Sequence, residues 1–313
     1  MDVGEDRPLG EEFEELRPQL FAIAYRMTGT VGDANDLVQE AFLRFARVVR
    51  DGVEIEFPRA YMSTVVTRLA IDAARAARAR RETYVGQWLP EPLLTDDPAD
   101  DPAARAEQAD SLSMAFLVVL ERLSPVERSV FLLHDVFGYD HREVAEIVGK
   151  SVENCRQLAR RARAHLAADR PRFEVSRRAR DALATRFFAA VTEGDLDALL
   201  EMLAADVVVY GDGGGKAPQW MHPIAGARRV ARMLVGLGRG LGSTGLVMRR
   251  HEVNGQPGAV VLDPDGRVVS VLAVDIADGA VQTVRSVINP DKLHHLGPVA
   301  DVWALVRRRS GAP

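Results

Sequence analysis

The sequence predicts two all-α domains followed by an α+β domain, and three observations lead to that prediction. Residues 11–82 contain three stretches with apolar residues at helical spacing. Residues 123–166 have the pattern of a helix, a helix-turn-helix and a basic tail. After about residue 177, two short helical stretches are followed by a strand, a helix and four strand-like runs with Asn-Gly or Asp-Gly turns between them.

The composition is that of a globular protein. The 313 residues suffice for two or three ordinary domains, and 47% are hydrophobic while 27% are charged. No segment approaches the roughly 18 consecutive apolar residues that span a bilayer. The acidic N-terminal stretch does not fit a secretory or mitochondrial leader, so we expect a cytoplasmic protein with no membrane partner.

Charge and cysteine content narrow the function further. Cys155 is the only cysteine, which excludes an internal disulfide and any multi-cysteine metal site. We expect no metal and no cofactor. The net charge of −5 argues against non-specific coating of DNA, because phosphate neutralisation dominates such binding. Arginines nevertheless crowd into residues 75–81 and 156–180, so basic surfaces are expected locally.

The first domain begins with two helices. The first, residues 11–27, is expected to start or kink near Pro18. The second opens at Asp33, and acidic and amide side chains gather at its start, where the helix dipole favours them. These side chains are Asp33, Asp36, Gln39 and Glu40. Residues 51–58 form a loop.

A third helix is predicted over residues 59–82. Its packed face is expected to carry Met62, Val65, Leu69 and Ala73. A second stripe leads into an arginine cluster and is formed by Thr64, Arg68, Ile71 and Arg75. This stripe suits docking on a nucleic-acid backbone and suits a solvated helix face equally well.

A linker follows at residues 84–110, because its closely spaced prolines and clustered acids favour an extended chain. Trp88 and Leu89 are poor linker residues, since a free chain gains nothing by exposing them. The stretch Trp88, Leu89, Pro90, Glu91 and Pro92 is therefore predicted to be a docking peptide. The alternative is that Trp88 packs back on the first domain.

The helix-turn-helix has clear boundary signals. Ser124 with Glu127, and Asp140 with Glu143, are spaced as N-cap and third helical residue. Gly149 is placed for the tight turn. In the last helix Cys155 faces inward, and an arginine-rich face points outward, which suits the major groove. The predicted DNA-contacting residues are Ser151, Glu153, Asn154, Arg156, Gln157, Arg160 and Arg161. The alternative is an ordinary charged surface helix.

The α+β domain is expected to be a cone of helices and antiparallel strands around a cavity. A glycine loop, Asp212–Lys216, follows its first strand and offers a backbone that another segment can approach closely. The turns between the last four strands are marked by Asn254-Gly255, Asp265-Gly266 and Asp278-Gly279. A tail helix is expected to cover the cone with Val302, Trp303 and Leu305.

Residues 33–45, 59–72 and 141–166 resemble regions 2 and 4 of the extracytoplasmic-function sigma factors of bacterial RNA polymerase. The resemblance implies that region 2 docks on the β′ clamp and opens the −10 element, while region 4 reads the −35 element beside the β flap. It places Asp33, Asp36, Gln39 and Glu40 on the polymerase. It also places −10 contacts at Phe57, Tyr61, Thr64, Arg68 and Arg75. Many family members carry asparagine where this chain has Arg68.

The C-terminal part resembles the SnoaL-like branch of the NTF2-like superfamily. The Trp88–Pro92 peptide, the glycine loop Asp212–Lys216 and a third motif, Asn289–Leu293, match the sigma subfamily that carries such a domain in cis. The residues implied in regulation are Trp88, Leu89, Pro90, Glu91, Pro92, Asp212, Gly213, Gly214, Gly215, Lys216, Asn289, Pro290, Asp291, Lys292 and Leu293.

These predictions divide the chain into six parts. They are a disordered tail (1–10), region 2 (11–88), the acidic linker (89–110), region 4 (111–170), the SnoaL-like domain (177–296) and a C-terminal helix or tail (297–313).

Two functions are weighed for the C-terminal domain. Asp212, Lys216 and His222 could serve acid–base chemistry. The glycine loop lacks the P-loop spacing, however, and fold analogy does not license catalysis. A regulatory, non-enzymatic domain is favoured. The alternative is a one-component DNA-binding regulator fused to a small-molecule-binding or enzymatic domain, and whether a small ligand fills the cavity is left open.

Overall fold

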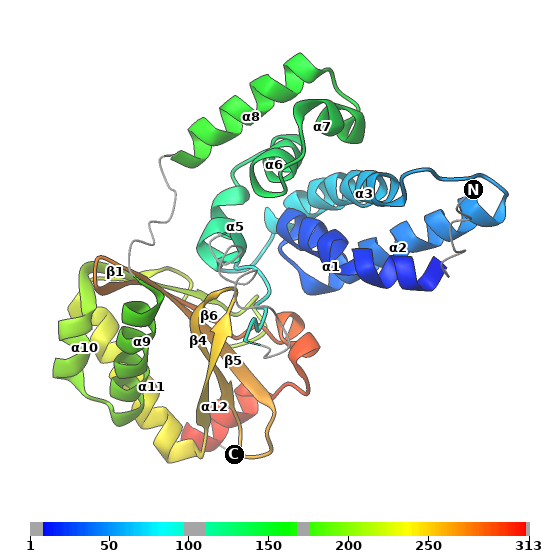
Figure 1. The fold of residues 1–313 in the computed structure, drawn as a ribbon. Helices are drawn as coiled ribbons and strands as arrows, with labels where there is room; N and C mark the ends of the chain where they lie inside the picture. Colours follow the sequence, from blue (N-terminus) through cyan, green and yellow to red (C-terminus); the bar gives the residue numbers. More distant parts are fainter. Residues whose placement is uncertain (1–8, 97–110, 168–175, 311–313) are drawn as a thin grey trace. The chain divides into compact units, whose positions relative to one another are not determined.

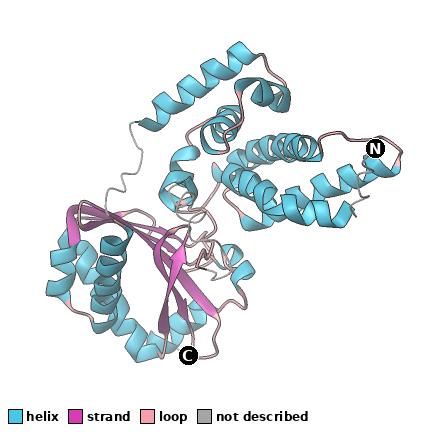
Figure 2. Ribbon diagram, in the orientation of Figure 1, coloured by secondary structure: helices cyan, strands magenta, loops and turns pink. Residues whose placement is uncertain are grey.

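The computed structural model describes residues 9–96, 111–167 and 176–310. The tail predicted over residues 1–10 and the acidic half of the linker therefore lie mostly outside the described residues. The chain divides into two compact units (Figures 1 and 2). The helical unit comprises residues 1–82 and 119–170, and the C-terminal unit comprises residues 83–118 and 171–313.

Three long helices open the helical unit: α1 (Leu9–Thr28), α2 (Val31–Arg50) and α3 (Pro58–Arg81). Pro18 lies inside α1 rather than at its start, so the prediction that the helix starts there is wrong. The three helices pack on one another around buried apolar side chains, among them Leu20, Phe45 and Val66.

The packed face of α3 differs from the prediction. Val65, Leu69 and Ala73 are only half-buried, whereas Val66, Thr67, Ala70, Ile71, Ala74 and Ala77 are buried. Ile71, predicted on the polar stripe, is 7% exposed. The reason is that α3 contacts α1 and α2 as well as the helices of the helix-turn-helix, so more than one of its faces is covered.

The remaining helices of this unit form the helix-turn-helix. They are α6 (Pro125–Phe131), a π-helical turn (Leu132–Val136), α7 (His141–Val148) and α8 (Val152–Ala167). Both predicted capping boxes are confirmed, at Ser124 with Glu127 and at Asp140 with Glu143. Gly149 ends α7 at φ 65°, a conformation that glycine adopts without strain.

The C-terminal unit contains a six-stranded sheet and several helices. Its elements are α5 (Met114–Leu120, its last two residues in the helical unit), α9 (Arg177–Glu193), α10 (Leu196–Met202), β1 (Leu203–Asp212), β2 (Ile224–Ala225), α11 (Ala227–Thr244), β3 (Val247–Val253), β4 (Gln256–Leu262), β5 (Val268–Ala277), β6 (Ala280–Val287), the 3₁₀ turns Pro290–Lys292 and His294–Leu296, and α12 (Val302–Ser310).

The strand order is β2-β1-β6-β5-β4-β3. Strands β3 to β6 form the predicted antiparallel meander, but β1 pairs with β6 in parallel, so the sheet is mixed rather than antiparallel. This follows from the connection through β2 and α11, which takes the chain to the far edge of the sheet before the meander returns it. The turns at Asn254-Gly255 and Asp278-Gly279 have positive φ at both residues, as type I′ hairpin turns require.

The two faces of the sheet are covered differently. Helices α9 and α11 cover one face, where Phe187, Leu234 and Val274 belong to the larger apolar core (Figure 1). On the other face a smaller core contains Leu89 from the linker together with Val271 and Leu293. Linker residues are thus part of the core of the C-terminal unit. In the described part of the chain, no helix combines the length and the apolarity needed to cross a membrane.

Candidate promoter-reading surfaces and linker clamp

Helix α8 presents one apolar and one charged face. Cys155, Leu158 and Ala162 are buried, and burial raises the pKa of the Cys155 thiol, which suits a packing role. The predicted −35 residues are all exposed: Ser151, Glu153, Asn154, Arg156, Gln157, Arg160 and Arg161. Arg156 forms only a long, exposed ion pair of 3.8 Å with Glu153, which is readily exchanged for a phosphate.

The residues predicted to dock on polymerase lie on the first turns of α2. Asp36 and Gln39 are exposed, and Asp33 and Glu40 are partly exposed. Asp33 accepts a hydrogen bond of 2.8 Å from the Thr30 hydroxyl. Glu40 accepts one of 2.7 Å from Arg44. The result is a hydrophilic stripe of acids and amides open to a partner.

The residues predicted to read the −10 element lie in the loop before α3 and along that helix. Phe57 is 65% exposed, and Arg75 is exposed beside Asp72. Tyr61 is half-buried, with its ring 6.1 Å from that of Phe45. The Thr64 hydroxyl donates to the backbone carbonyl of its own helix at Ala60. Of these four, Phe57 and Arg75 are the ones most open to a nucleic acid.

Arg68 is engaged with the helix-turn-helix. Its Nε donates to the carbonyl of Ile147 at 2.9 Å, and a terminal nitrogen donates to the carbonyl of Glu146 at 3.1 Å. These carbonyls lie in the last turn of α7, where a cation is favoured by the helix dipole. Arg68 therefore caps α7, a contact that no pattern in the sequence indicates.

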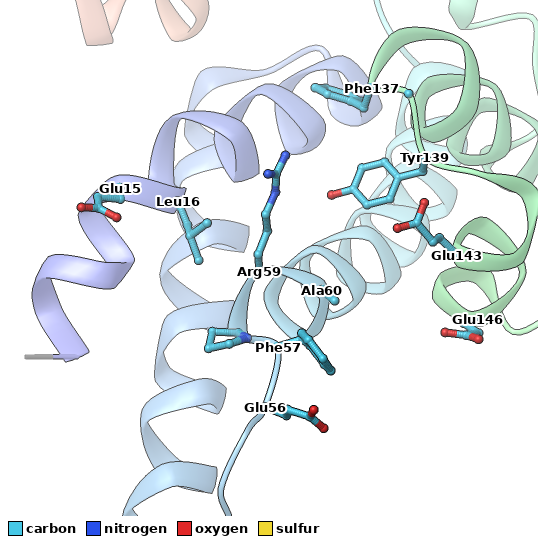
Figure 3. Close-up of a pocket in the computed structure, with 12 residues that line it drawn as sticks. Glu15, Leu16, Glu56, Phe57, Arg59, Ala60, Phe137, Tyr139, Glu143 and Glu146 are labelled. Atoms are coloured by element: carbon cyan, nitrogen blue, oxygen red, sulfur yellow. The ribbon is translucent and has the colours of Figure 1, made fainter. Parts of the chain in front are cut away.

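Tyr139, in the loop before α7, makes a second contact of this kind. Its hydroxyl lies 2.9 Å from Gln19 Nε2 and 2.9 Å from the Ser63 hydroxyl. Tyr139 and Phe57 line the same pocket of about 700 Å³ (Figure 3). Of the predicted −10 residues, Arg68 thus bonds to region 4 directly, and Phe57 shares a pocket with Tyr139 of region 4.

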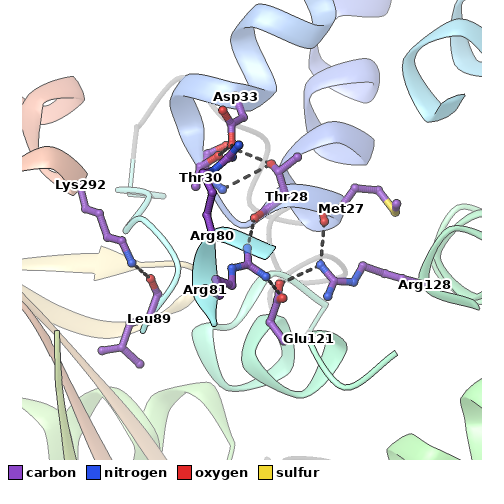
Figure 4. Close-up of polar contacts among 10 residues, drawn as sticks. All are labelled: Met27, Thr28, Thr30, Asp33, Arg80, Arg81, Leu89, Glu121, Arg128 and Lys292. Carbon is purple, nitrogen blue, oxygen red and sulfur yellow. Dashed lines mark hydrogen bonds and ion pairs between the residues drawn. The ribbon is translucent and has the colours of Figure 1, made fainter. Parts of the chain in front are cut away.

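A buried arginine network joins α6 to the first helices. Arg128 donates to the carbonyl of Met27 at 2.7 Å and to the Glu121 carboxylate at 2.8 Å (Figure 4). Glu121 also pairs with Arg81, which donates to the carbonyl of Thr28 at 2.7 Å. Burial lowers the pKa of Arg128 to about 9. For Arg81, burial and the nearby Arg128 charge lower the pKa to about 9.

In the C-terminal unit, Asp212 is the centre of a cluster that we call the linker clamp: Tyr84, Trp88, Leu89, Asp212, Asn289 and Lys292. The Asp212 carboxylate is fully buried at the end of β1. It accepts hydrogen bonds from the Leu89 amide at 2.8 Å and from the Tyr84 hydroxyl at 2.5 Å. It also accepts from Lys292 Nζ at 2.6 Å.

Lys292, which belongs to the Asn289–Leu293 motif, completes the clamp. Its buried ammonium donates to the Leu89 carbonyl at 2.5 Å (Figure 4). Because the Leu89 amide donates to Asp212, both polar backbone groups of Leu89 are held. The ammonium also lies 4.5 Å from the centre of the Trp88 ring and 4.9 Å from that of Tyr84, in cation–π geometry. Trp88 and Leu89 therefore dock on the C-terminal domain.

The phenol of Tyr84 is held protonated. Its pKa is raised above the usual range, first by burial and then by the hydrogen bond and charge of Asp212. Asn289 Nδ2 donates to the same hydroxyl at 2.8 Å. Tyr84 was not singled out in the sequence, although it precedes Trp88 by only four residues.

The linker continues along the edge of the sheet. Leu93 exchanges hydrogen bonds of 2.9 and 2.8 Å with the side chain and the backbone of Asn254. Leu94 bridges to Val253 in antiparallel fashion, and the Thr95 amide donates to the carbonyl of Glu252. The extended linker therefore adds a short pairing to β3.

The glycine loop allows this close approach. A Cβ on Gly214, whose φ is +57°, would lie 2.3 Å from Asn289 Nδ2 and 3.0 Å from the Tyr84 hydroxyl. A Cβ on Gly215 would lie 3.1 Å from the Val85 Cβ. Lys216, at the end of the loop, forms an exposed ion pair of 2.5 Å with Asp291. The Trp88–Pro92 peptide, the glycine loop and the Asn289–Leu293 motif thus meet at one place.

Gly214→Ala is expected to weaken linker docking, because the added methyl group meets Asn289 and the left-handed backbone costs about 1–2 kcal/mol in addition. Hydrogen exchange of the amides in residues 84–95 should rise. Gly194→Ala is the control, since φ there is +70° but the Cβ meets nothing closer than 3.8 Å. Equal exchange in the two variants would contradict the prediction.

The candidates for acid–base chemistry differ in their surroundings. Asp212 is held by Lys292, Tyr84 and Leu89, as described above. Lys216 and His222 are exposed. The tail helix was expected to cover the domain with Val302, Trp303 and Leu305. Val302 and Leu305 do pack against the larger core, but Trp303 is 45% exposed.

Three protein-family models match the chain in order. They are Sigma-70 region 2 over residues 13–80, Sigma-70 region 4 over residues 113–166, and a SnoaL-like domain over residues 184–288.

Similar proteins match over most of their length. The chain is 41% identical to the ECF RNA polymerase sigma factor SigJ of Mycobacterium tuberculosis over 293 residues, which cover 90% of this chain and 92% of that protein. It is 32% identical to the probable ECF RNA polymerase sigma factor SigI of the same species, over 92% of this chain and 96% of that one.

The crystal structure of M. tuberculosis SigJ matches the fold with a TM-score of 0.72 and 39% identity, covering 91% of this chain and 98% of that one. The matched regions occur in the order sigma region 2, region 4 and SnoaL-like domain. The chain belongs to the ECF RNA polymerase sigma factors that carry a C-terminal SnoaL-like domain.

Proposed function

We propose that this sigma factor is regulated in cis by the linker clamp and that it reads its promoter with two separate surfaces of the helical unit. The observation that carries the proposal is the grip of Asp212 and Lys292 on both backbone groups of Leu89. The protein acts in the cytoplasm on core polymerase. No reaction is assigned to its C-terminal domain.

Promoter reading is divided between α8 and the α3 region. The exposed arginine and amide side chains of α8 contact base edges and phosphates of the −35 element in the major groove. Phe57 and the exposed face of α3 contact the opened −10 strand, whose unstacked bases need a pocket rather than a groove. The acidic stripe on α2 docks on the β′ clamp.

The packing of region 2 on region 4 is a promoter-incompetent arrangement. Arg68 cannot contact a −10 base while its guanidinium caps α7, and Tyr139 lies across the same pocket from Phe57. Binding to polymerase has to break these contacts before the two surfaces engage elements at a fixed separation.

The linker clamp controls how freely the two regions separate. Residues 84–95, part of the connection between regions 2 and 4, are held on the C-terminal domain along much of their length. A coupling of about 1–3 kcal/mol between linker docking and promoter binding changes activity roughly 5–150-fold. Modest changes in clamp stability are therefore sufficient for regulation.

Specific promoter binding is expected only in the presence of core polymerase, because the −10 contacts require melted DNA and Arg68 is otherwise occupied. A gel shift with the full-length chain, with and without core polymerase, tests this. The D36A/Q39A double variant should lose polymerase binding, since both side chains lie exposed on α2. Tight sequence-specific binding by the chain alone would favour the one-component regulator instead.

Tyr139→Phe is expected to loosen region 2 from region 4. It removes the hydroxyl that bonds Gln19 and Ser63, and each of these partly buried hydrogen bonds is expected to contribute about 0.5–1.5 kcal/mol. Fluorescence energy transfer between dyes on α2 and α8 should report a larger open fraction. Tyr61→Phe is the control, because it removes a phenol hydroxyl from the same region and its ring lies beside Phe45 of α2. An unchanged distance distribution for Tyr139→Phe would contradict the closed packing.

A further inference from the structure

The C-terminal unit contains a cavity on the sheet face opposite the linker clamp. Its volume is about 480 Å³. Strand β6 lines it with Val284 and Ser286, β5 with Leu272, and α11 with Leu237. Close-packed protein interiors leave few voids larger than one water molecule, whereas small-molecule sites have roughly 300–1,000 Å³. A hollow of this size is the size of a ligand site, not of a packing defect.

The lining of the cavity specifies the chemistry of its occupant. Among the described lining residues none is acidic, basic, histidine, cysteine or tyrosine. A charged ligand would have to lose its hydration without an opposite charge to compensate, which is costly. The polar groups are few: Gln219, Thr244, Ser270 and Ser286, together with the indole of Trp220. Such a lining fits an uncharged, mainly apolar molecule with one or two hydroxyl or carbonyl groups.

The absence of titratable groups from the described lining also favours binding over acid–base catalysis. Asp212 follows Val209 by three positions on β1, so its side chain points to the opposite face of the sheet, toward the clamp. Val209 lines the cavity. Proton transfer within the cavity would need a group that this lining lacks.

Two walls of the cavity are in direct contact with the clamp region: one bonds to the linker and the other to the glycine loop Asp212–Lys216. Trp220 lines the cavity, and its carbonyl accepts a hydrogen bond of 3.3 Å from Gln87 of the linker. Helix α12 lines it with Val302, Leu305 and Val306, and Trp303 Nε1 on that helix donates to the carbonyl of Lys216 at 2.9 Å.

Gln219 forms a third connection. Its side chain fills the space beside the glycine loop, since a Cβ on Gly211 would lie 2.3 Å from the Gln219 Cδ, and one on Gly213 would lie 2.8 Å from its Cβ. The Gln219 amide faces the Ser286 hydroxyl at 3.5 Å inside the cavity. A ligand group that bonds Ser286 therefore displaces or orients the residue against which the loop packs.

From this arrangement we infer that the cavity binds an uncharged, largely apolar small molecule and that its occupancy changes the hold of the clamp on the linker. The coupling part rests on the proposed regulation by the clamp, whereas the binding part does not. A ligand has to alter Gln219, Trp220 or α12 differently in the docked and released states of the linker, because only differential affinity shifts an equilibrium.

The test is a titration of the full-length protein with Nile red, an uncharged polycyclic dye that carries a ring carbonyl. We expect saturable binding at one site per chain. The anionic dye 1-anilinonaphthalene-8-sulfonate should not compete, because the lining offers no cation. Competition by the anionic dye would overturn the inferred ligand class.

Variants locate the site. Ser270→Phe and Leu237→Trp fill the cavity from β5 and from α11, and each is expected to weaken Nile red binding at least tenfold. Val247→Phe is the matched control, since Val247 is 52% exposed on β3. Thermal unfolding identifies any filling variant that fails to fold, and the other then decides. Parental affinity in a folded filling variant would overturn the cavity assignment.

The coupling between cavity occupancy and linker docking is measured separately. Saturating Nile red should change hydrogen exchange of residues 84–95 by a factor between about 5 and 150. Gln87→Ala, which removes the bond to Trp220 but lies outside the cavity, should reduce that factor. Binding without any change in linker exchange would overturn the coupling. If clamp variants alter neither linker exchange nor transcription, the proposed regulation fails while ligand binding stands.

Discussion

Lys292→Met is expected to release the linker from the C-terminal domain. The substitution leaves the fully buried Asp212 carboxylate without its cation, and breaking a buried ion pair in this way costs about 3–5 kcal/mol. It also removes the hydrogen bond to the Leu89 carbonyl. Hydrogen exchange of the amides in residues 84–95 should accelerate on the order of 10²–10³-fold, since 1.4 kcal/mol is tenfold.

Two further variants separate the buried pair from general charge effects. Lys216→Ala removes an ion pair that is more than half exposed on both partners, so an effect within about 1 kcal/mol is expected. The double variant D212N/K292M should be less disturbed than Lys292→Met, because it leaves no unpaired buried charge. Equal hydrogen exchange of residues 84–95 in Lys292→Met and Lys216→Ala would contradict the role given to the buried pair.

Clamp release should also reach transcription. Lys292→Met and a chain truncated after about residue 180 are both expected to change promoter output while polymerase binding is kept, because α2 is intact in each. A change in either direction supports regulation in cis, since the clamp can restrain or support promoter engagement. Parental transcription from both would leave the C-terminal domain without a regulatory role.

The triple variant R156A/Q157A/R160A is expected to lower transcription from the cognate promoter by more than 100-fold. Each lost base contact costs about 1–3 kcal/mol, and all three side chains are exposed on α8. Because none of them is part of the core, the melting temperature should stay close to that of the parent. Run-off transcription with reconstituted holoenzyme is the measurement.

The control for this variant matches its loss of charge. Arg228 and Arg229 are exposed at the start of α11, and R228A/R229A removes the same number of cations from the C-terminal domain. If both variants lose activity equally, the effect is electrostatic rather than promoter reading.

Cys155→Ser should instead lower stability without changing promoter preference, because its thiol is buried.

Local signals in the sequence were sufficient for much of the fold. The capping boxes at Ser124 and Asp140 and the glycine turn at Gly149 predict the helix-turn-helix because each depends on residues within three or four positions. The hairpins at Asn254 and Asp278 are predictable for the same reason. The sequence also indicated a docking peptide at Trp88–Pro92 and a glycine-rich loop that another segment can approach closely, but the partner of each came from the structure.

Contacts between distant segments could not be predicted. The bonds of Arg68 to the carbonyls of α7 join positions almost 80 apart, and carbonyls carry no sequence signal. Periodicity shows that α3 has an apolar face but not that a second set of helices covers another side, so Ile71 was assigned to the wrong stripe. The parallel pairing of β1 with β6 depends on the route of the whole chain.

The smaller core of the C-terminal unit is built from residues synthesised far apart in time. Leu89 leaves the ribosome about 200 residues before Leu293, its partner in that core. At roughly 5–20 residues per second, the nascent chain spends about 10–40 s with its linker peptide uncovered. The helical unit is complete well before that interval ends. Every newly made molecule therefore passes through a period in which the helical unit is complete and the linker is not yet docked, and docking begins only when translation has passed the last strand.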